Sequence, residues 1–129
     1  MDKQELYQFA FNTLFHKKLK RFGTAGHVAC ALETSKGNIF TGVCIDLPCS
    51  IGLCAEQSAI AEMVKNQETV IEQIIAVFED GSILSPCGRC RELMAQIDEE
   101  NLEAKIILPK MKEVPLKALL PERWDDKWS

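Results

Sequence analysis

Three cysteines and one glutamate stand in two short motifs whose residue types suit a catalytic metal centre. Cys54 and Glu56 lie two positions apart, and Cys87 and Cys90 follow in the run Pro-Cys-Gly-Arg-Cys. Thiolates from the three cysteines would fill three tetrahedral positions of a Zn²⁺ ion and leave one open, as in a catalytic zinc site. Water would take the open position, and Glu56 could exchange a proton with it without binding the metal. The motifs therefore predict a hydrolytic zinc centre with its own general acid and base.

The same cysteines could instead form a closed structural zinc site or lie in the core as inert thiols. A closed site needs a fourth ligand, and the rival for that position is Cys49, five residues before Cys54. A structural zinc site does not need a carboxylate such as Glu56 that is not a ligand, so we favour the catalytic interpretation. Of the other cysteines, Cys30 is predicted to be a buried strand residue, and Cys44 belongs either to the core or to a pocket wall.

Two helices are predicted to begin at these motifs. Apolar residues repeat at helical spacing between residues 54 and 66, and a second helical pattern runs from residue 87 to about residue 97. Pro86 fixes the approach of the chain to the second helix. Both motifs then lie at a helix N-terminus, where free N–H groups and the helix dipole stabilise a thiolate. Two helix starts are therefore expected to converge on one metal ion.

The rest of the chain alternates between helical and strand patterns. Asp2 is a plausible N-cap for the first helix, and residues 46–53 form a loop leading into the first metal motif. Periodicity predicts the remaining elements: a helix over 2–20, a hairpin of 27–33 and 38–45, strands over 70–78 and 105–108, a short strand at 113–114, one helical turn at 116–120 and a polar tail over 121–129. This order predicts an α/β fold with an open sheet and helices on both faces.

Length and charge limit the classes of function. The 129 residues, of which 47% are hydrophobic, are enough for one domain with a real core, so we expect a single domain over residues 1–129. The net charge is −4 and the basic residues are scattered, which argues against binding of nucleic-acid polymers and favours a small-molecule substrate. We see no secretory leader and no apolar run of membrane-spanning length, so we expect no membrane partner, a cytoplasmic protein and reduced thiols.

Several segments together resemble the zinc-dependent cytidine deaminase superfamily, and within it most closely the blasticidin S deaminases. They are residues 37–43, 54–56, 83–91 and 119–121, and they cover most of the chain after Ala29. The resemblance implies a three-layer α-β-α fold around a mixed sheet of about five strands. It also implies that Cys54, Cys87 and Cys90 bind one Zn²⁺ per subunit, that Glu56 is the proton shuttle, and that the assembly is a homotetramer.

The implied reaction is the hydrolytic conversion of a cytosine ring to uracil and ammonia. The substrate would be a free nucleoside or nucleoside analogue, of the cytidine, deoxycytidine or blasticidin S type. A different class remains open, in which the chain is a non-catalytic or divergent zinc-binding protein of the same fold that acts on another amino-substituted ring or as an assembly module. Replacement of Glu56 separates these classes, because only the enzyme depends on it.

Five residues are expected to contact the substrate: Asp46, Cys44, Ala55, Trp124 and His27. Ordinary cytidine deaminases bind ribose hydroxyls with an Asn-Val-Glu-Asn-like segment, whereas this chain has Cys44, Ile45 and Asp46 there. His27 either lines the pocket or is a structural strand residue. Trp124 either closes over the base, often from a neighbouring subunit in relatives, or is an anchor at the surface or at a subunit interface.

Three thiolates make the implied zinc site negative, so nearby donors must offset the charge. Many relatives have an Arg directly after the catalytic Glu, but this chain has Gln57. Arg89 and Arg91 are the candidates that could take its place, and Pro86 is expected beside the site.

Overall fold

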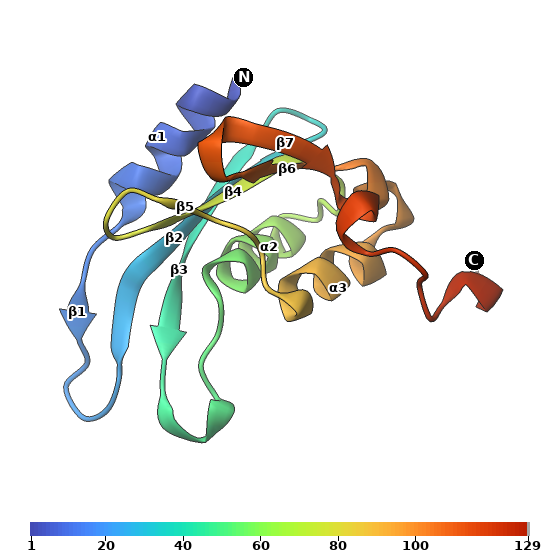
Figure 1. Cartoon of the computed structure of the whole chain (residues 1–129). Helices are drawn as coiled ribbons and strands as arrows, with labels where there is room; N and C mark the ends of the chain where they lie inside the picture. Colours follow the sequence, from blue (N-terminus) through green and yellow to red (C-terminus); the bar gives the residue numbers. More distant parts are fainter. Residues whose placement is uncertain (129) are drawn as a thin grey trace.

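The computed structural model describes residues 1–128, which form three α-helices and seven strands joined by loops and short 3₁₀ turns. The helices are α1 (Lys3–Thr13), α2 (Ala55–Lys65) and α3 (Gly88–Ile97). The strands are β1 (Lys17–Lys18), β2 (Thr24–Thr34), β3 (Ile39–Asp46), β4 (Ile71–Phe78), β5 (Ile83–Leu84), β6 (Lys105–Leu108) and β7 (Lys112–Pro115). The 3₁₀ turns are Pro48–Ser50, Glu99–Glu103, Pro109–Met111, Leu116–Leu119 and Asp126–Trp128. Figure 1 shows this arrangement.

The strands form one mixed sheet. Antiparallel pairs join β3 to β2, β2 to β4 and β6 to β7, while β4 and β6 run parallel. The two-residue strand β1 pairs with β2, and the two-residue strand β5 pairs with β4, both antiparallel. Five strands of four or more residues therefore make up the body of the sheet, which confirms the expected mixed sheet of about five strands.

Side chains of alternate residues in the central strands contribute to two hydrophobic cores, one on each face of the sheet. One core packs α2 and α3 against the sheet and contains Cys30, Leu32, Ile74 and Ile106. The other packs α1 against the opposite face and contains Ala31, Ile75, Val77 and Ile107. Helices thus cover both faces (Figure 1), and the predicted three-layer α-β-α fold is confirmed.

The predicted first helix is too long at its C-terminal end. Asp2 caps α1 as expected by accepting a hydrogen bond from the Glu5 N–H, but the helix ends at Thr13 rather than near residue 20. After it, the Phe15 N–H donates to the Gly26 carbonyl, and β1 pairs with β2. Sheet pairing therefore replaces helical hydrogen bonds where the sequence still shows apolar residues at helical spacing.

The other predicted elements agree with the structure to within a few residues. Cys54 and Cys87 are the N-caps of α2 and α3, so both metal motifs do lie at helix starts. The predicted hairpin is β2 and β3, and the short strand near residue 113 is β7. The helical turn expected at 116–120 is the 3₁₀ turn Leu116–Leu119.

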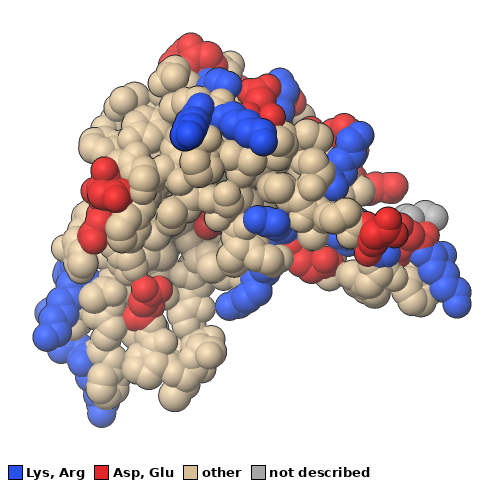
Figure 2. All heavy atoms as spheres, in the orientation of Figure 1, with Lys and Arg blue, Asp and Glu red and all other residues tan. Residues whose placement is uncertain are grey.

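Acidic and basic side chains are interspersed over most of the face of the molecule shown in Figure 2. Basic side chains gather at its lower left edge, the region of β1, where the sequence has Lys17, Lys18, Lys20 and Arg21. None of the helices described in residues 1–128 is long and apolar enough to cross a membrane.

Candidate active site

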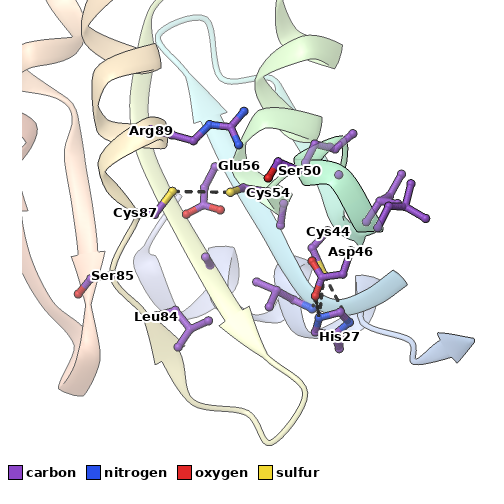
Figure 3. A pocket seen from close by; sticks show the side chains of 17 residues that line it. His27, Cys44, Asp46, Ser50, Cys54, Glu56, Leu84, Ser85, Cys87 and Arg89 are labelled. Carbon is purple, nitrogen blue, oxygen red and sulfur yellow. Dashed lines mark hydrogen bonds and ion pairs between the residues drawn. The ribbon is translucent and has the colours of Figure 1, made fainter. Parts of the chain in front are cut away.

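A pocket of about 460 Å³ lies where β2 and β3 meet the starts of α2 and α3. Figure 3 shows that its labelled side chains come from both helix starts and from the strands. Other parts of the pocket wall come from the loop before α2, from β4 and β5, and from the segment after β5. The lining residues are His27, Val28, Cys44, Ile45, Asp46, Leu47, Ser50, Gly52, Leu53, Cys54, Ala55, Glu56, Ala76, Leu84, Ser85, Cys87 and Arg89.

Three thiols meet at one side of this pocket. The Cys87 sulfur lies 3.6 Å from the Cys54 sulfur and 3.4 Å from the Cys90 sulfur. All three sulfur atoms lie within 4.8 Å of one another. Three soft thiolate donors on two rigid helix starts fit a zinc ion, with a fourth position available on the pocket side. Cys49 is exposed and does not belong to this group within residues 1–128.

The surroundings of the three thiols favour different protonation states. Burial raises the pKa of Cys54, and its hydrogen bond with Cys87 adds to this. Burial raises the pKa of Cys90 far above its ordinary value, and the negative charge of Glu56 adds to this. Burial also opposes ionisation of Cys87, but hydrogen bonds from the Cys90 and Arg89 amides and from the neighbouring thiols leave its pKa below the usual value. Holding all three as thiolates at this spacing requires a cation between them.

Glu56 presents a buried carboxyl group to the thiols. It lies in the first turn of α2 and is 6% exposed, and Figure 3 shows its carboxylate between Cys54 and Cys87. Burial raises the pKa of Glu56, partly offset by a backbone hydrogen bond. A small cavity of about 10 Å³ lies beside it, and the residues that line this cavity with Glu56 include the apolar Pro86 and Ile106. A raised pKa makes the protonated form of this carboxyl group easier to reach than that of an exposed one, which suits a group that accepts and donates protons.

The two candidate arginines occupy different places. Arg89 lines the pocket, and Figure 3 shows its guanidinium on the side where Cys54, Cys87 and Glu56 gather. Arg91 instead donates from Nε to the Pro86 carbonyl at 2.8 Å and from a terminal nitrogen to the Leu119 carbonyl at 3.3 Å. The geometry thus gives Arg89 access to the pocket, whereas Arg91 fixes the backbone around Pro86.

Gln57 has a role that the sequence analysis missed. Its side-chain oxygen accepts a hydrogen bond of 3.0 Å from the backbone N–H of Cys54. This contact closes the first turn of α2 and thereby fixes the backbone that carries the first thiol. The signal was in the sequence, because a Gln three residues after an N-cap is half of a capping box.

A second group of polar side chains lies at another part of the pocket. His27 Nε2 is 2.9 Å from an Asp46 carboxylate oxygen, and the Cys44 sulfur is 3.5 Å from the His27 ring nitrogens. Both His27 and Cys44 line the pocket, and Cys44 is also buried. Cys30 is fully buried, as predicted.

Trp124 lies outside the pocket of its own chain. Its side chain is on the surface, where the residue is 64% exposed, and the indole N–H donates to Glu92 at 3.1 Å. The Trp124 ring lies 5.9 Å from the Trp128 ring, measured between centroids. The C-terminal segment that carries both rings extends away from the body of the molecule (Figure 1).

Two glycines that the sequence analysis did not single out set how closely the site elements pack. A Cβ on Gly42 of β3 would come within 2.4 Å of the Ala59 nitrogen in α2. A Cβ on Gly52 would come within 2.1 Å of the Ile45 carbonyl oxygen. Both contacts are non-local, so no periodic pattern could reveal them.

Comparison with known proteins identifies related sequences. The family model described as the cytidine and deoxycytidylate deaminase zinc-binding region matches residues 3–104. The chain is 35% identical to a cytidine deaminase from Shewanella halifaxensis over 74% of this chain, and it spans only 31% of that relative. It is 30% identical to a blasticidin-S deaminase from Bacillus cereus, over 70% of this chain and 76% of the relative.

Solved structures of similar shape carry the same family name. The cytidine deaminase from Mycobacterium leprae matches with a TM-score of 0.79 and 26% identity, over 95% of this chain and 99% of that one. The cytidine deaminase from Bacillus anthracis matches with a TM-score of 0.75 and 27% identity, over 97% of this chain and 91% of that one. Both cover nearly the whole described fold.

Proposed function

The chain belongs to the cytidine and deoxycytidylate deaminase family, and on that premise we propose that it is a zinc-dependent hydrolytic deaminase. Its substrate is the cytosine ring of a free nucleoside or nucleoside analogue, and its products are the uracil ring and ammonia. Residues 1–129 form a single catalytic domain in this proposal. The observation that carries it is the meeting of three thiols and one buried carboxyl group at the wall of one pocket, which Cys54, Glu56 and Cys87 line, while Cys90 is buried beside them.

Cys54, Cys87 and Cys90 hold one zinc ion in this proposal. Zinc in such a site supplies a Lewis acid that makes water nucleophilic near neutral pH. Arg89 and the N-terminal amides of α2 and α3 offset the negative charge of the three thiolates. This assignment is supported by the position of Arg89 in the pocket wall and by the place of both thiol motifs at helix starts.

Glu56 moves the protons of the reaction. It takes one proton from the attacking water and delivers it to N3 of the ring, while the water oxygen bonds to C4. It then carries the second proton to the amino group on C4, the C–N bond breaks, and ammonia leaves with C4 retaining the oxygen. The raised pKa of Glu56 supports this role, because its protonated and ionised forms are closer in energy than those of an exposed carboxyl group.

The substituent on the ring nitrogen extends toward Asp46, His27 and Cys44, with Ala55 beside the ring. All four residues line the pocket. Cytidine deaminases and a blasticidin-S deaminase are both among the relatives, so cytidine, deoxycytidine and blasticidin S are the substrates to compare. We further propose a homotetramer, in which Trp124 of one chain closes over the pocket of a neighbour. The exposure of Trp124 and its absence from the lining of its own pocket support this.

A substrate panel tests the proposed function. The purified protein is given cytidine, deoxycytidine and blasticidin S side by side, and loss of the cytosine absorbance and release of ammonia are followed together with zinc content. We expect turnover of at least one of the three, with about one zinc ion per chain. Absence of both signals with every compound, in protein that contains zinc, would refute the assignment of the ring.

A further inference from the structure

His27, Cys44 and Asp46 form a cluster of metal-binding side-chain types apart from the three thiols. One ligand atom from each residue can be chosen so that all lie within 4.8 Å of one another, as is also true of the thiol group. Figure 3 shows the cluster on one side of the pocket and Cys54, Cys87 and Glu56 on the other. The two groups therefore share one pocket without sharing a ligand.

An irregularity in the sheet brings these three residues together. Cys44 and Asp46 alternate with Ile45 along β3 and so point to the same face. Opposite them, the register shifts between Ala25 and Ala29 of β2, where β2 takes four residue steps against two in β3. Such a bulge redirects side chains, and here His27 lies within it. The ligand set is thus held by two paired strands.

The donor types and spacings suit a transition metal. Imidazole nitrogen, thiolate sulfur and carboxylate oxygen are all zinc ligands, with bonds of about 2.0–2.3 Å that place neighbouring donors roughly 3.3–3.6 Å apart in a tetrahedron. The sulfur lies 3.5 Å from the imidazole nitrogens, and the carboxylate oxygen lies 2.9 Å from Nε2. The two sulfur–nitrogen distances fall in that range, while the oxygen–nitrogen distance is shorter, so Asp46, which is on the surface, would have to move outward to bind the same ion.

The cluster is buried at Cys44 and accessible to solvent at Asp46. Cys44 is 5% exposed, whereas the side chains of His27 and Asp46 are 16% and 64% exposed. An ion can therefore enter from solvent beside Asp46 and meet a thiol whose position is fixed by the core. Three protein ligands leave the fourth tetrahedral position free.

We propose that His27, Cys44 and Asp46 form a second transition-metal site in the pocket, distinct from the three-thiol site and open to exchange with solvent. An ion there occupies the groups that would otherwise face the substituent of the substrate. Excess Zn²⁺ therefore competes with the substrate and inhibits the enzyme. Metal binding itself does not depend on the proposed function; only this inhibition rests on it.

A zinc titration tests the site directly. Protein carrying its tightly bound zinc is freed of excess metal and titrated with Zn²⁺ against a chromophoric chelator, beside the variants His27→Gln, Cys44→Ser and Asp46→Asn. The control is Cys49→Ser, which removes an exposed thiol from the loop before α2. Wild type and the control are expected to bind a further equivalent. Each cluster variant should bind that equivalent at least about tenfold more weakly, the scale seen even when an outer-shell partner of a metal ligand is removed.

Two outcomes overturn the site: wild type binds no further equivalent, or the cluster variants bind it as wild type does. Asp46→Asn keeps the test decisive if Cys44→Ser fails to fold, because Asp46 is on the surface. Kinetics with cytidine give the second readout, in which added Zn²⁺ should raise KM and leave kcat unchanged. If the further equivalent binds and no cytosine compound is deaminated, the proposed function fails and the second site stands.

Discussion

Cys54 has two structural roles, one in the backbone of α2 and one in the pocket wall. Its backbone begins α2 and its thiol faces Cys87, so a small error in the first turn of α2 moves a proposed metal ligand. The hydrogen bond from the Cys54 N–H to Gln57 is what fixes this turn. Gln57 therefore positions the site without touching a reacting atom.

Replacing Gln57 by Ala should destabilise the protein and weaken zinc retention. The Cys54 N–H loses its acceptor, a change that costs about 1–2 kcal/mol at a helix start. Urea denaturation measures the loss, and Gln57→Glu, which keeps an acceptor oxygen, should recover most of it. Gln8→Ala on the exposed side of α1 is the matched control and should change stability by less than about 0.5 kcal/mol. Equal effects of Gln57→Ala and Gln8→Ala would refute this role.

The residues of the site differ in how far the sequence could predict them. Cys54, Glu56, Cys87 and Cys90 could be predicted as one group because their types and spacing suit a metal centre. The structure brings the three sulfur atoms together, with Glu56 in the same pocket wall as Cys54 and Cys87. The choice between the two candidate arginines could not be made, because two residues in one helical turn point in different directions that depend on tertiary packing.

At the scale of elements, β3 and α2 must lie very close for the site to form. The absence of a side chain at Gly42 permits this, since a Cβ there would lie 2.4 Å from the Ala59 nitrogen and 2.6 Å from the Ser58 side chain. Both neighbours belong to α2, which also carries Glu56. The distance between β3 and α2 is thus coupled to the position of the Glu56 carboxyl group, the proposed proton shuttle.

Gly42→Ala should therefore lower both stability and activity. The added methyl group forces α2 away from β3 at a cost of about 1–3 kcal/mol and displaces Glu56 relative to the thiols. Gly88→Ala is the matched control for stability, because a Cβ there meets nothing within 4 Å. Thermal unfolding and turnover of the best substrate measure the two effects. A Gly42→Ala protein as stable as Gly88→Ala would contradict the close packing.

The first helix shows where local patterns lose predictive power. Apolar residues continue at helical spacing beyond Thr13, yet the backbone leaves the helix and the Phe15 N–H pairs with Gly26. That hydrogen bond joins residues distant in sequence, so tertiary pairing decides the boundary. The helices α2 and α3 were predicted to within about one residue because capping and core packing agree at their starts.

At the scale of the whole molecule, the three thiols come from the starts of two helices that are far apart in the sequence. Cys54 belongs to the start of α2, and Cys87 and Cys90 to the start of α3. A metal ion bound by all three would link these elements in the folded state only. Zinc binding should therefore contribute to the free energy of unfolding of the entire domain.

Removing zinc with a chelator should lower the melting temperature, and returning one equivalent should restore it. Differential scanning calorimetry measures both, with Mg²⁺ as the control ion because thiolates bind it poorly. A melting temperature that does not respond to chelation would contradict a zinc site that joins α2 and α3.

The most direct test of the account is the rate of cytosine deamination by Glu56→Gln. The neutral side chain keeps the size of a buried carboxyl group, so zinc content and melting temperature should match wild type. The catalytic rate should fall by about 10²–10⁴-fold, because no group remains to move the protons. Glu62→Gln, on the exposed side of the same helix, should keep the wild-type rate. Turnover by zinc-loaded Glu56→Gln at the wild-type rate would contradict the central claim that Glu56 is the proton shuttle.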